Sequence, residues 1–207
     1  DRLTDAEAAT LPCAGLTAWN ALVEQGGVKP GETVATLGTG GVSSFALMIA
    51  NQIGAETIIT SSSDEKLERM LSAGADHGIN YVRNEQWGER IKKLTDGVGA
   101  DHVIEVGGAD TLPKSIGAVR PGGEVSLIGV LSGTIDDFNV IPVLMQNIRI
   151  QGVIVGHREM FERFCDALET ADWRPMVDRT FDFENVHEAL EFVIAGEHVG
   201  KVAIEIG

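Results

Sequence analysis

Three closely spaced glycines are the feature of the sequence that most clearly indicates chemistry. Gly38, Gly40 and Gly41 follow an apolar run that begins at Thr33, and a helix-length apolar segment follows Ser43. This order predicts a buried strand, a tight turn and a helix whose amino terminus binds the diphosphate of a dinucleotide. Gly38 would allow the sharp turn, and Gly40 would let phosphate oxygens approach the backbone because glycine has no Cβ. The G-x-G-x-x-G pattern is incomplete at Ser43, so the motif alone fits an ordinary glycine turn equally well.

The end of the second predicted strand bears on which nucleotide binds. That strand ends at Ser61, the first of three serines, where dinucleotide-binding folds place the residue that meets the adenosine ribose. An acidic residue there would accept hydrogen bonds from the ribose of NAD, whereas serine tolerates the 2′-phosphate of NADP. Lys66 and Arg69 would add positive charge, so the sequence favours NADP over NAD. A structural alternative also fits, in which Ser62 caps the next helix and Glu65 completes a capping box.

Strand and helix signals alternate through most of the chain. Six apolar or β-branched runs are separated by helix-length segments, and several of the runs end in glycine. This alternation predicts an α/β fold with a doubly wound parallel sheet, helices on both faces, and ligands at the carboxyl ends of the strands. After the sixth run, at 147–155, the sequence predicts a helix over 158–171 and then a strand, a helix and a final strand.

Composition and charge argue against several classes of function. The chain has 207 residues, of which 43% are hydrophobic, so it can bury a sizeable core. Its net charge of −15 argues against nucleic acid or an anionic membrane as a partner. No apolar segment is long enough to cross a bilayer. The two cysteines, Cys13 and Cys165, form no disulfide framework, so we expect a reducing, cytoplasmic location.

Six segments in a fixed order give the chain a resemblance to the medium-chain dehydrogenase/reductases, which include zinc alcohol dehydrogenases and quinone oxidoreductases. The segments are LPCAGLTAWNAL, KPGETVATLGTGGVS, SSSDEKLERMLSAGADHGINY, GADHVIEVGG, RPGGEVSLIGV and GKVAIEI. The resemblance implies an NAD(P)-binding Rossmann domain over 15–156. It also implies that 1–14 and 157–207 belong to a GroES-like catalytic domain, whose N-terminal bulk would precede Asp1.

The activity that the resemblance implies is an NAD(P)-dependent oxidoreductase of the alcohol dehydrogenase or quinone/enone reductase type. Hydride would pass between the nicotinamide and a carbonyl or activated alkene of a small-molecule substrate. Because most of the catalytic domain would be missing, we expect the isolated chain to be inactive. Two alternatives keep the same fold, a non-catalytic dinucleotide-binding module and a crystallin-like structural protein. A methyltransferase also has a glycine-rich first turn, but the closing GKVAIEI segment argues against it.

The resemblance assigns cofactor-binding roles but no catalytic residue. It implies that the pyrophosphate is met by Gly38, Gly40, Gly41, Val42 and Lys201, and the adenosine ribose by Ser61 and Lys66. Val42 would also pack against the nicotinamide, Thr17 would lie near its ring, and backbone groups of Ile128, Val153 and Val155 would meet its carboxamide. Structural alternatives remain open, since Val153 and Val155 would also suit a core strand and Lys201 a solvated surface.

Cys13 is the only candidate metal ligand. Its counterpart in zinc alcohol dehydrogenases binds the catalytic metal, which needs three protein ligands. The five histidines are scattered and suggest no second ligand. We therefore expect no metal in this chain and predict that Cys13 is a small buried hydrophobe.

The resemblance also implies how two chains would pair. Cofactor domains of this family often associate through the edge strand after the fifth strand, which here is 147–155. This segment is long and apolar, and Arg149 is its only charged residue. An exposed edge of that kind promotes aggregation unless it is paired or covered. We therefore predict a homodimer through this strand, although the tail or the missing domain could cover it instead.

Overall fold

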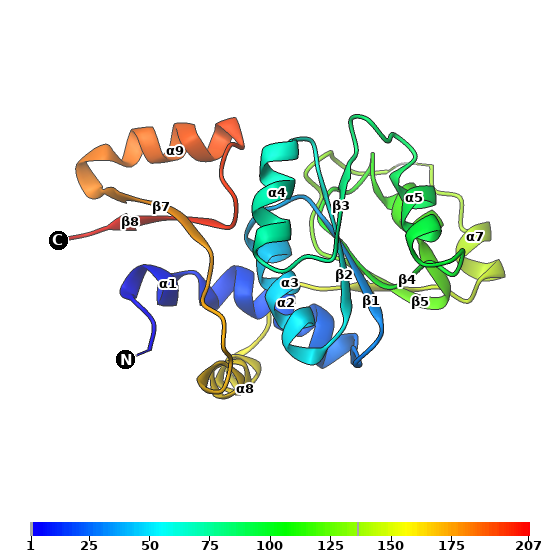
Figure 1. Cartoon of the computed structure of the whole chain (residues 1–207), viewed down its shortest axis with the longest axis horizontal. Coiled ribbons are helices and arrows are strands. Elements are labelled where there is room, and N and C mark those ends of the chain that lie inside the picture. Colours follow the sequence, from blue (N-terminus) through cyan, green and yellow to red (C-terminus); the bar gives the residue numbers. More distant parts are fainter. Residues whose placement is uncertain (1, 136) are drawn as a thin grey trace.

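A six-stranded parallel sheet forms the centre of the protein. The computed structural model describes residues 2–135 and 137–207. The strands lie in the order β3-β2-β1-β4-β5-β6 (Figure 1). They are β1 (Thr33–Leu37), β2 (Glu56–Ser61), β3 (His77–Asn80), β4 (Ala100–Glu105), β5 (Val119–Leu127) and β6 (Arg149–Gly152). The chain order reverses between β1 and β4, and this switch point is where doubly wound folds bind ligands. The predicted doubly wound α/β fold is confirmed.

Helices cover both faces of the sheet. Val34 and Ile104 point to one face, where they share a core with α3 (Gly41–Ile53) and α8 (Arg158–Glu169). Ala35 and Val103 point to the other face and pack with α5 and α6. Neighbouring residues of one strand thus enter different cores, as the alternation of side chains along a strand requires. The remaining helices of the sheet domain are α2 (Leu16–Trp19), α4 (Asp64–Ser72), α5 (Trp87–Leu94), α6 (Leu112–Ala118) and α7 (Ile141–Met145). Two π-helical stretches, Leu11–Gly15 and Asn20–Gln25, flank α2.

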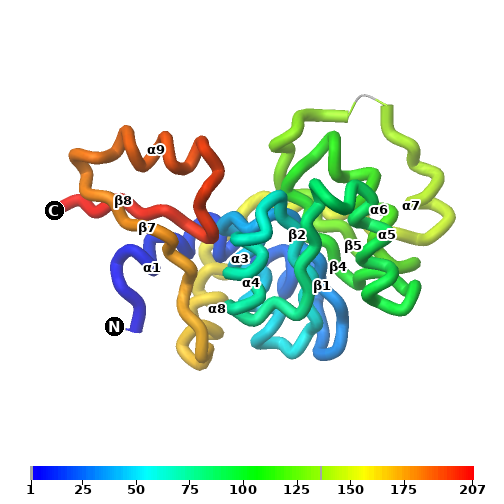
Figure 2. The backbone as a smooth tube through the Cα atoms, turned by 45° about the horizontal axis from the view of Figure 1, so that its top comes forward, coloured from blue at the N-terminus to red at the C-terminus, as the bar shows by residue number. Residues whose placement is uncertain are grey.

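A small lobe stands beside the sheet domain. It contains the parallel strands β7 (Val177–Asp182) and β8 (Lys201–Glu205), joined through a 3-10 turn (Phe183–Asn185) and α9 (Val186–Ala195). Helix α1 (Asp5–Ala9) lies next to this pair of strands, so the two ends of the chain meet on the side away from α7 (Figure 2). The predicted sequence of strand, helix and strand is therefore correct.

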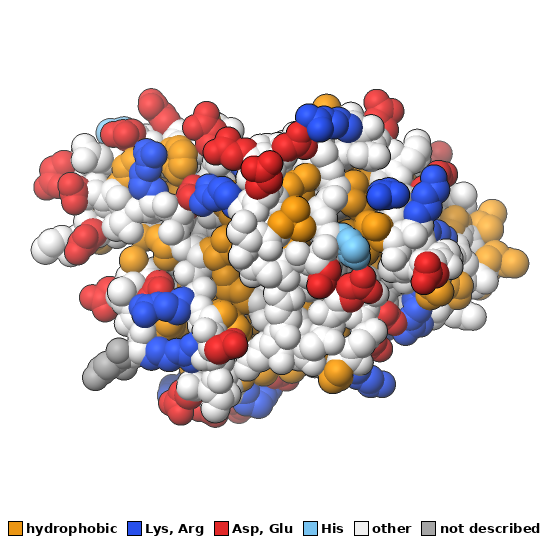
Figure 3. All heavy atoms as spheres, in the orientation of Figure 1, with side chains coloured by type: hydrophobic (Ala, Val, Ile, Leu, Met, Phe, Trp, Pro, Cys, Tyr) orange, Lys and Arg blue, Asp and Glu red, His pale blue; other side chains and the backbone are white. Residues whose placement is uncertain are grey.

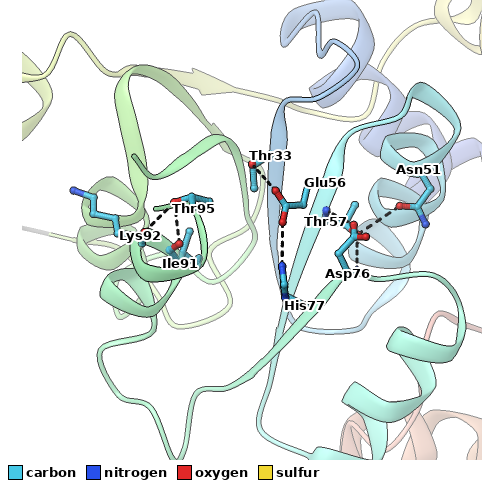
Figure 4. A network of polar contacts seen from close by, with 9 residues as sticks. All are labelled: Thr33, Asn51, Glu56, Thr57, Asp76, His77, Ile91, Lys92 and Thr95. Atoms are coloured by element: carbon cyan, nitrogen blue, oxygen red, sulfur yellow. Dashed lines mark hydrogen bonds and ion pairs between the residues drawn. The ribbon is translucent and has the colours of Figure 1, made fainter. Parts of the chain in front are cut away.

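Polar side chains join the strands at their amino-terminal ends, here called the amino edge of the sheet (Figure 4). The Glu56 carboxylate contacts His77 Nε2 at 3.0 Å and Thr33 Oγ1 at 3.5 Å, which ties three strands together. Asp76 accepts hydrogen bonds from the Thr57 amide at 2.8 Å and the Thr57 hydroxyl at 3.0 Å. Because these side chains secure the amino ends, the glycine-rich loops at the opposite edge remain available to a ligand.

The edge strand is shorter than the sequence predicts. Strand β6 covers Arg149–Gly152 instead of 147–155. Asn147 and Val155 have φ of 52° and 40°, so left-handed backbone ends the extended segment on both sides. The amide of Val153 still donates to the Leu127 carbonyl at 3.0 Å and continues the ladder by one bond.

The surface charge is scattered. On the face shown in Figure 3, Lys and Arg side chains lie in separate spots among acidic ones. None of the described helices has the length and apolar character that crossing a bilayer requires.

An ion pair between Glu7 and Arg174 joins α1 to the segment before β7. The hydrogen bond from the Arg174 guanidinium lowers the pKa of Glu7 from 4.5 to about 2. Because the folded-state pKa is depressed, the stabilisation is complete above pH 4.5 and is lost as the pH falls through about 2. We expect Glu7→Gln to lower the free energy of unfolding at pH 7 by about 0.5–1 kcal/mol. In urea denaturation, the difference from wild type should narrow below pH 4.5.

The control is Glu162→Gln. Glu162 pairs with Arg158 on the exposed surface of α8, so this variant should change the free energy of unfolding less. If the loss of unfolding free energy in Glu7→Gln stays constant from pH 7 to pH 3, the lowered pKa of Glu7 is not the source of the stabilisation.

Candidate functional site

The glycine turn lies at the carboxyl end of β1. Gly38 has φ of 72°, a left-handed conformation that glycine adopts without strain. Gly40 is the N-cap of α3 with extended backbone, and no protein atom lies within 4 Å of a Cβ built there. The space in front of Gly40, at the start of α3, is therefore open. Ser43 is buried and donates a hydrogen bond to the Leu37 carbonyl at 2.7 Å, so it closes the turn from within.

The small lobe reaches the glycine turn. Gly40 forms a parallel bridge with Gly200, and the Gly200 amide donates to the Thr39 carbonyl at 2.8 Å. A Cβ at Gly41 would lie 2.4 Å from Cδ of Lys201. The stem of Lys201 thus packs across the first turn of α3, which brings its ammonium close to the amino terminus of the helix. An anion at this point would meet both the helix and the lysine.

An apolar pocket of about 340 Å³ adjoins the turn. It is built from the carboxyl ends of β1, β2 and β4 and the loops that follow β3 and β5. Its walls include Gly38, Thr60, Tyr81, Trp87, Gly107 and Leu131. The aromatic and aliphatic walls suit a flat ring, and the glycine turn beside them suits phosphate. Of these six residues, Gly38 alone had been predicted to bind the cofactor.

The serines after β2 are arranged differently from the prediction. Ser63, and not Ser62, is the N-cap of α4, and its hydroxyl accepts a hydrogen bond from the Lys66 amide at 3.3 Å. The helix begins at Asp64, as predicted, and its cap is the residue directly before it. Ser61 is buried at the end of β2, and its hydroxyl accepts from the Ser63 amide at 3.2 Å.

The two predicted cations of α4 both contact the small lobe. Lys66 Nζ donates to the Gly196 carbonyl, and Arg69 forms an ion pair with Asp178. They line a cleft of about 550 Å³ between α4 and the lobe, together with Ser62 and Arg179. The Lys66 ammonium has three N–H groups, so it can keep this bond and still donate to an anion at the ribose end.

The residues predicted around the nicotinamide lie close to one core. Val42, Ile128 and Val153 pack with the cluster of α3, α8 and Ile104. Thr17 is buried, and its hydroxyl donates to the Cys13 carbonyl at 2.6 Å.

Two of the backbone groups predicted to face the carboxamide are already bonded. The Val155 carbonyl accepts from Asn20 Nδ2 at 3.0 Å, and the Ile128 amide donates to the Glu105 carbonyl at 2.8 Å. The Val155 carbonyl and the Ile128 amide thus each have a hydrogen-bond partner within the protein.

Cys13 does not behave as predicted. It is exposed, and so is Pro12, whereas Leu11 and Ala14 on the same helical turn are buried. The helix presents its other face to the core, so the expectation of a buried Cys13 is wrong. Within 2–135 and 137–207, no group of three or more His, Cys, Asp or Glu side chains could hold a metal ion.

His198 lies in the loop that joins α9 to β8. Burial lowers the pKa of His198, and the nearby charges of Lys66 and Lys201 lower this pKa further, although Asp178 opposes them. The neutral imidazole is therefore favoured at pH 7, and the positive charge at this end of the site comes from lysine and arginine.

The chain is similar to proteins that are described as dehydrogenases. A family model described as zinc-binding dehydrogenase matches residues 41–170. A zinc-type alcohol dehydrogenase-like protein of Schizosaccharomyces pombe is 46% identical over 97% of this chain and 60% of its own length. A candidate alcohol dehydrogenase from Sinorhizobium meliloti 1021 has a TM-score of 0.93 and 48% identity, covering 99% of this chain and 59% of that one. A mycobacterial protein complexed with NADPH has a TM-score of 0.89 and 26% identity, covering 100% and 66%. The chain spans about 60% of the length of the curated relatives that it matches first.

Gly40 provides a direct test of the site. Its N-cap backbone is extended and its surroundings are open, so Gly40→Val should fold and lose about 1 kcal/mol or less of stability. The valine side chain would occupy the space in front of α3 and should weaken dinucleotide binding more than tenfold, by roughly 1.4 kcal/mol. Fluorescence titration with NADPH measures this change.

The matched control is Gly117→Val on α6, where no atom lies within 4 Å of the built Cβ and no pocket wall is touched. It should bind as wild type does. A folded Gly40→Val variant with wild-type affinity would show that the diphosphate binds elsewhere.

Proposed function

The chain belongs to the zinc-binding dehydrogenase family of medium-chain dehydrogenase/reductases, and on this premise we propose that it is the cofactor-binding part of an NAD(P)-dependent oxidoreductase. The observation that carries the proposal is the open space in front of Gly40 at the start of α3, which lies at the switch point of the sheet beside an apolar pocket. A dinucleotide needs this combination of a diphosphate site and a pocket for a flat ring.

The described residues accommodate such a cofactor. The amides of Gly40, Gly41 and Val42 would meet the diphosphate, with the Lys201 ammonium nearby. The adenine would occupy the pocket next to Gly38, and the nicotinamide would extend toward Ile128 and Val153. When bound, the nicotinamide supplies the hydride chemistry, while the protein orients it and excludes water.

Zinc does not fit the described residues. A catalytic zinc site requires three protein ligands, and Cys13 is the only candidate. We therefore assign a metal no role in the chemistry of the described residues. We propose that the substrate is a small molecule with a carbonyl or activated alkene, and that the isolated chain transfers little hydride.

We propose that NADP(H) is preferred over NAD(H). Ser61 ends β2, where we expect the adenosine ribose to lie, and a carboxylate there would repel a 2′-phosphate. Lys66 and Arg179 line the cleft beside α4. Wild-type protein should therefore bind NADPH more tightly than NADH. Ser61→Asp should reverse the order, because its carboxylate repels the phosphate and accepts hydrogen bonds from the ribose hydroxyls of NADH.

Fluorescence titration with NADPH, NADH and S-adenosylmethionine tests both the function and the preference. Thr170→Asp is the control, since it adds the same charge at an exposed position on another helix end. If wild type binds NADH about tenfold more tightly than NADPH, a difference of roughly 1.4 kcal/mol in binding free energy, the proposed preference is wrong. Binding of S-adenosylmethionine without either dinucleotide would contradict the function.

We propose that two chains pair through the β6 edge. Strand β6 hydrogen-bonds to β5 alone among the described strands. Helix α7, directly before it, exposes Val140, Ile141, Leu144 and Met145, with 73% and 74% of the last two accessible. Pairing would bury this apolar surface and satisfy the strand edge.

Light scattering at micromolar concentration should show a dimer. Met145→Glu should give a monomer, because burying an unpaired carboxylate at the contact is costly. Ile194→Glu is the control, since Ile194 is 84% exposed on α9 at the opposite end of the molecule. A wild-type monomer under these conditions would rule the pairing out.

A further inference from the structure

A fully buried carboxylate lies beneath the proposed nucleotide site. Glu105 is the last residue of β4, the strand next to β1 at the switch point, and none of its surface is exposed. An ionised carboxylate in such a place must be compensated by a cation or by several hydrogen bonds. No ion pair to Glu105 forms within the described residues.

Hydrogen bonds from the next loop and helix satisfy this carboxylate. Its Oε1 accepts from the Gly107 amide at 2.7 Å, the Gly108 amide at 3.0 Å and the Thr111 hydroxyl at 2.6 Å. Its Oε2 accepts from the Ser115 hydroxyl. The chain from β4 to α6 thus wraps around one side chain, and hydrogen bonds to a charged acceptor are stronger than neutral ones.

The loop held in this way forms part of the pocket wall. Gly107 and Thr111 line the apolar pocket. The Gly107 carbonyl accepts from the Ser132 amide at 2.7 Å and the Ser132 hydroxyl at 2.9 Å. These bonds fasten the loop after β5 to the loop after β4. The loop after β5 carries Leu131, another wall residue. Two loops on separate strands therefore depend on the Glu105 carboxylate for their position.

We infer that Glu105 is a positioning residue for the adenosine half of the dinucleotide. The inference rests on the proposed function and adds a group that never touches the ligand. The carboxylate fixes the wall against which the adenine ring packs before any ligand arrives, and such preorganisation raises affinity by reducing the ordering needed on binding. The nicotinamide half lies outside this wall, so it should depend much less on the Glu105 side chain.

The first test uses Glu105→Gln, which keeps the shape of the side chain but removes its charge and one acceptor oxygen. We expect the affinity for 5′-AMP to fall about tenfold. The affinity for reduced nicotinamide mononucleotide should stay within about twofold. Both are measured on the full 207-residue chain, 5′-AMP by displacement of NADPH fluorescence and reduced nicotinamide mononucleotide, which shares the NADPH fluorophore, by calorimetric titration. Hydrogen exchange at the amides of Gly107 and Gly108 should become faster.

The control is Glu124→Gln. Glu124 is another buried carboxylate, but it lies with Arg149 and Asp101 in a cleft outside the apolar pocket. This variant should lose stability without a change in the affinity for 5′-AMP. If Glu105→Gln loses affinity equally for 5′-AMP and for reduced nicotinamide mononucleotide, the inference is overturned. It is also overturned if this variant keeps the wild-type affinity for 5′-AMP.

Ser115→Ala covers the case in which Glu105→Gln does not fold. Ser115 is fully buried and does not line the pocket, so its hydroxyl can act on the ligand only through Glu105. We expect about a threefold loss of affinity for 5′-AMP, and an unchanged affinity would overturn the inference. If wild type binds neither NADPH nor 5′-AMP, the proposed function fails, and the inference fails with it.

Discussion

The close approach of three backbone segments at the glycine turn is the constraint on which the site depends. The end of β1, the first turn of α3 and the start of β8 meet where Gly40 bridges Gly200. A side chain at Gly41 would collide with Lys201, which lies across the helix start. The Gly200 amide bonds the Thr39 carbonyl, and no atom lies within 4 Å of a Cβ built at Gly40, so the lobe is fastened to the turn without filling the space in front of Gly40. The space in front of Gly40 therefore stays open for a ligand.

The two edges of the sheet are stabilised by different means. At the amino edge, carboxylates such as Glu56 and Asp76 join neighbouring strands through side-chain contacts (Figure 4). At the carboxyl edge, short loops rich in glycine carry the walls of the pocket, and the buried Glu105 holds two of them. Carboxylates such as Glu56 and Asp76 thus lie at the opposite end of the sheet from the backbone amides that would bind an anion.

The small lobe is linked to the nucleotide end of the site as well as to the glycine turn. Lys66 and Arg69 of α4 bind the Gly196 carbonyl and Asp178, and the Asp178 carboxylate also accepts from the Val199 amide at 3.2 Å. The loop between α9 and β8 is therefore anchored at the start of both α3 and α4. The Lys66 ammonium has three N–H groups, so a nucleotide that recruits it would share this cation with the Gly196 carbonyl of the lobe.

Local features of the sequence determined the order of the strands and helices, the glycine turn and the family. Side-chain periodicity and the conformational freedom of glycine act over a few residues, so they can be read without knowledge of the fold. The helix cap at Ser63 and the short β6 differ from the predictions by one to a few residues, because element ends depend on backbone angles such as those of Asn147 and Val155.

Only the tertiary structure decided which residues form the pocket and which side of a helix is buried. Tyr81, Trp87 and Leu131 come from separate loops and helices, and no local pattern joins them. Cys13 is exposed because the helix turns its other side to the core, and that choice depends on what packs against it. The role of Glu105 follows from donors up to ten residues away that meet only when β4, its loop and α6 are folded together. Contacts of this kind are set by packing, which the order of residues specifies only through the whole fold.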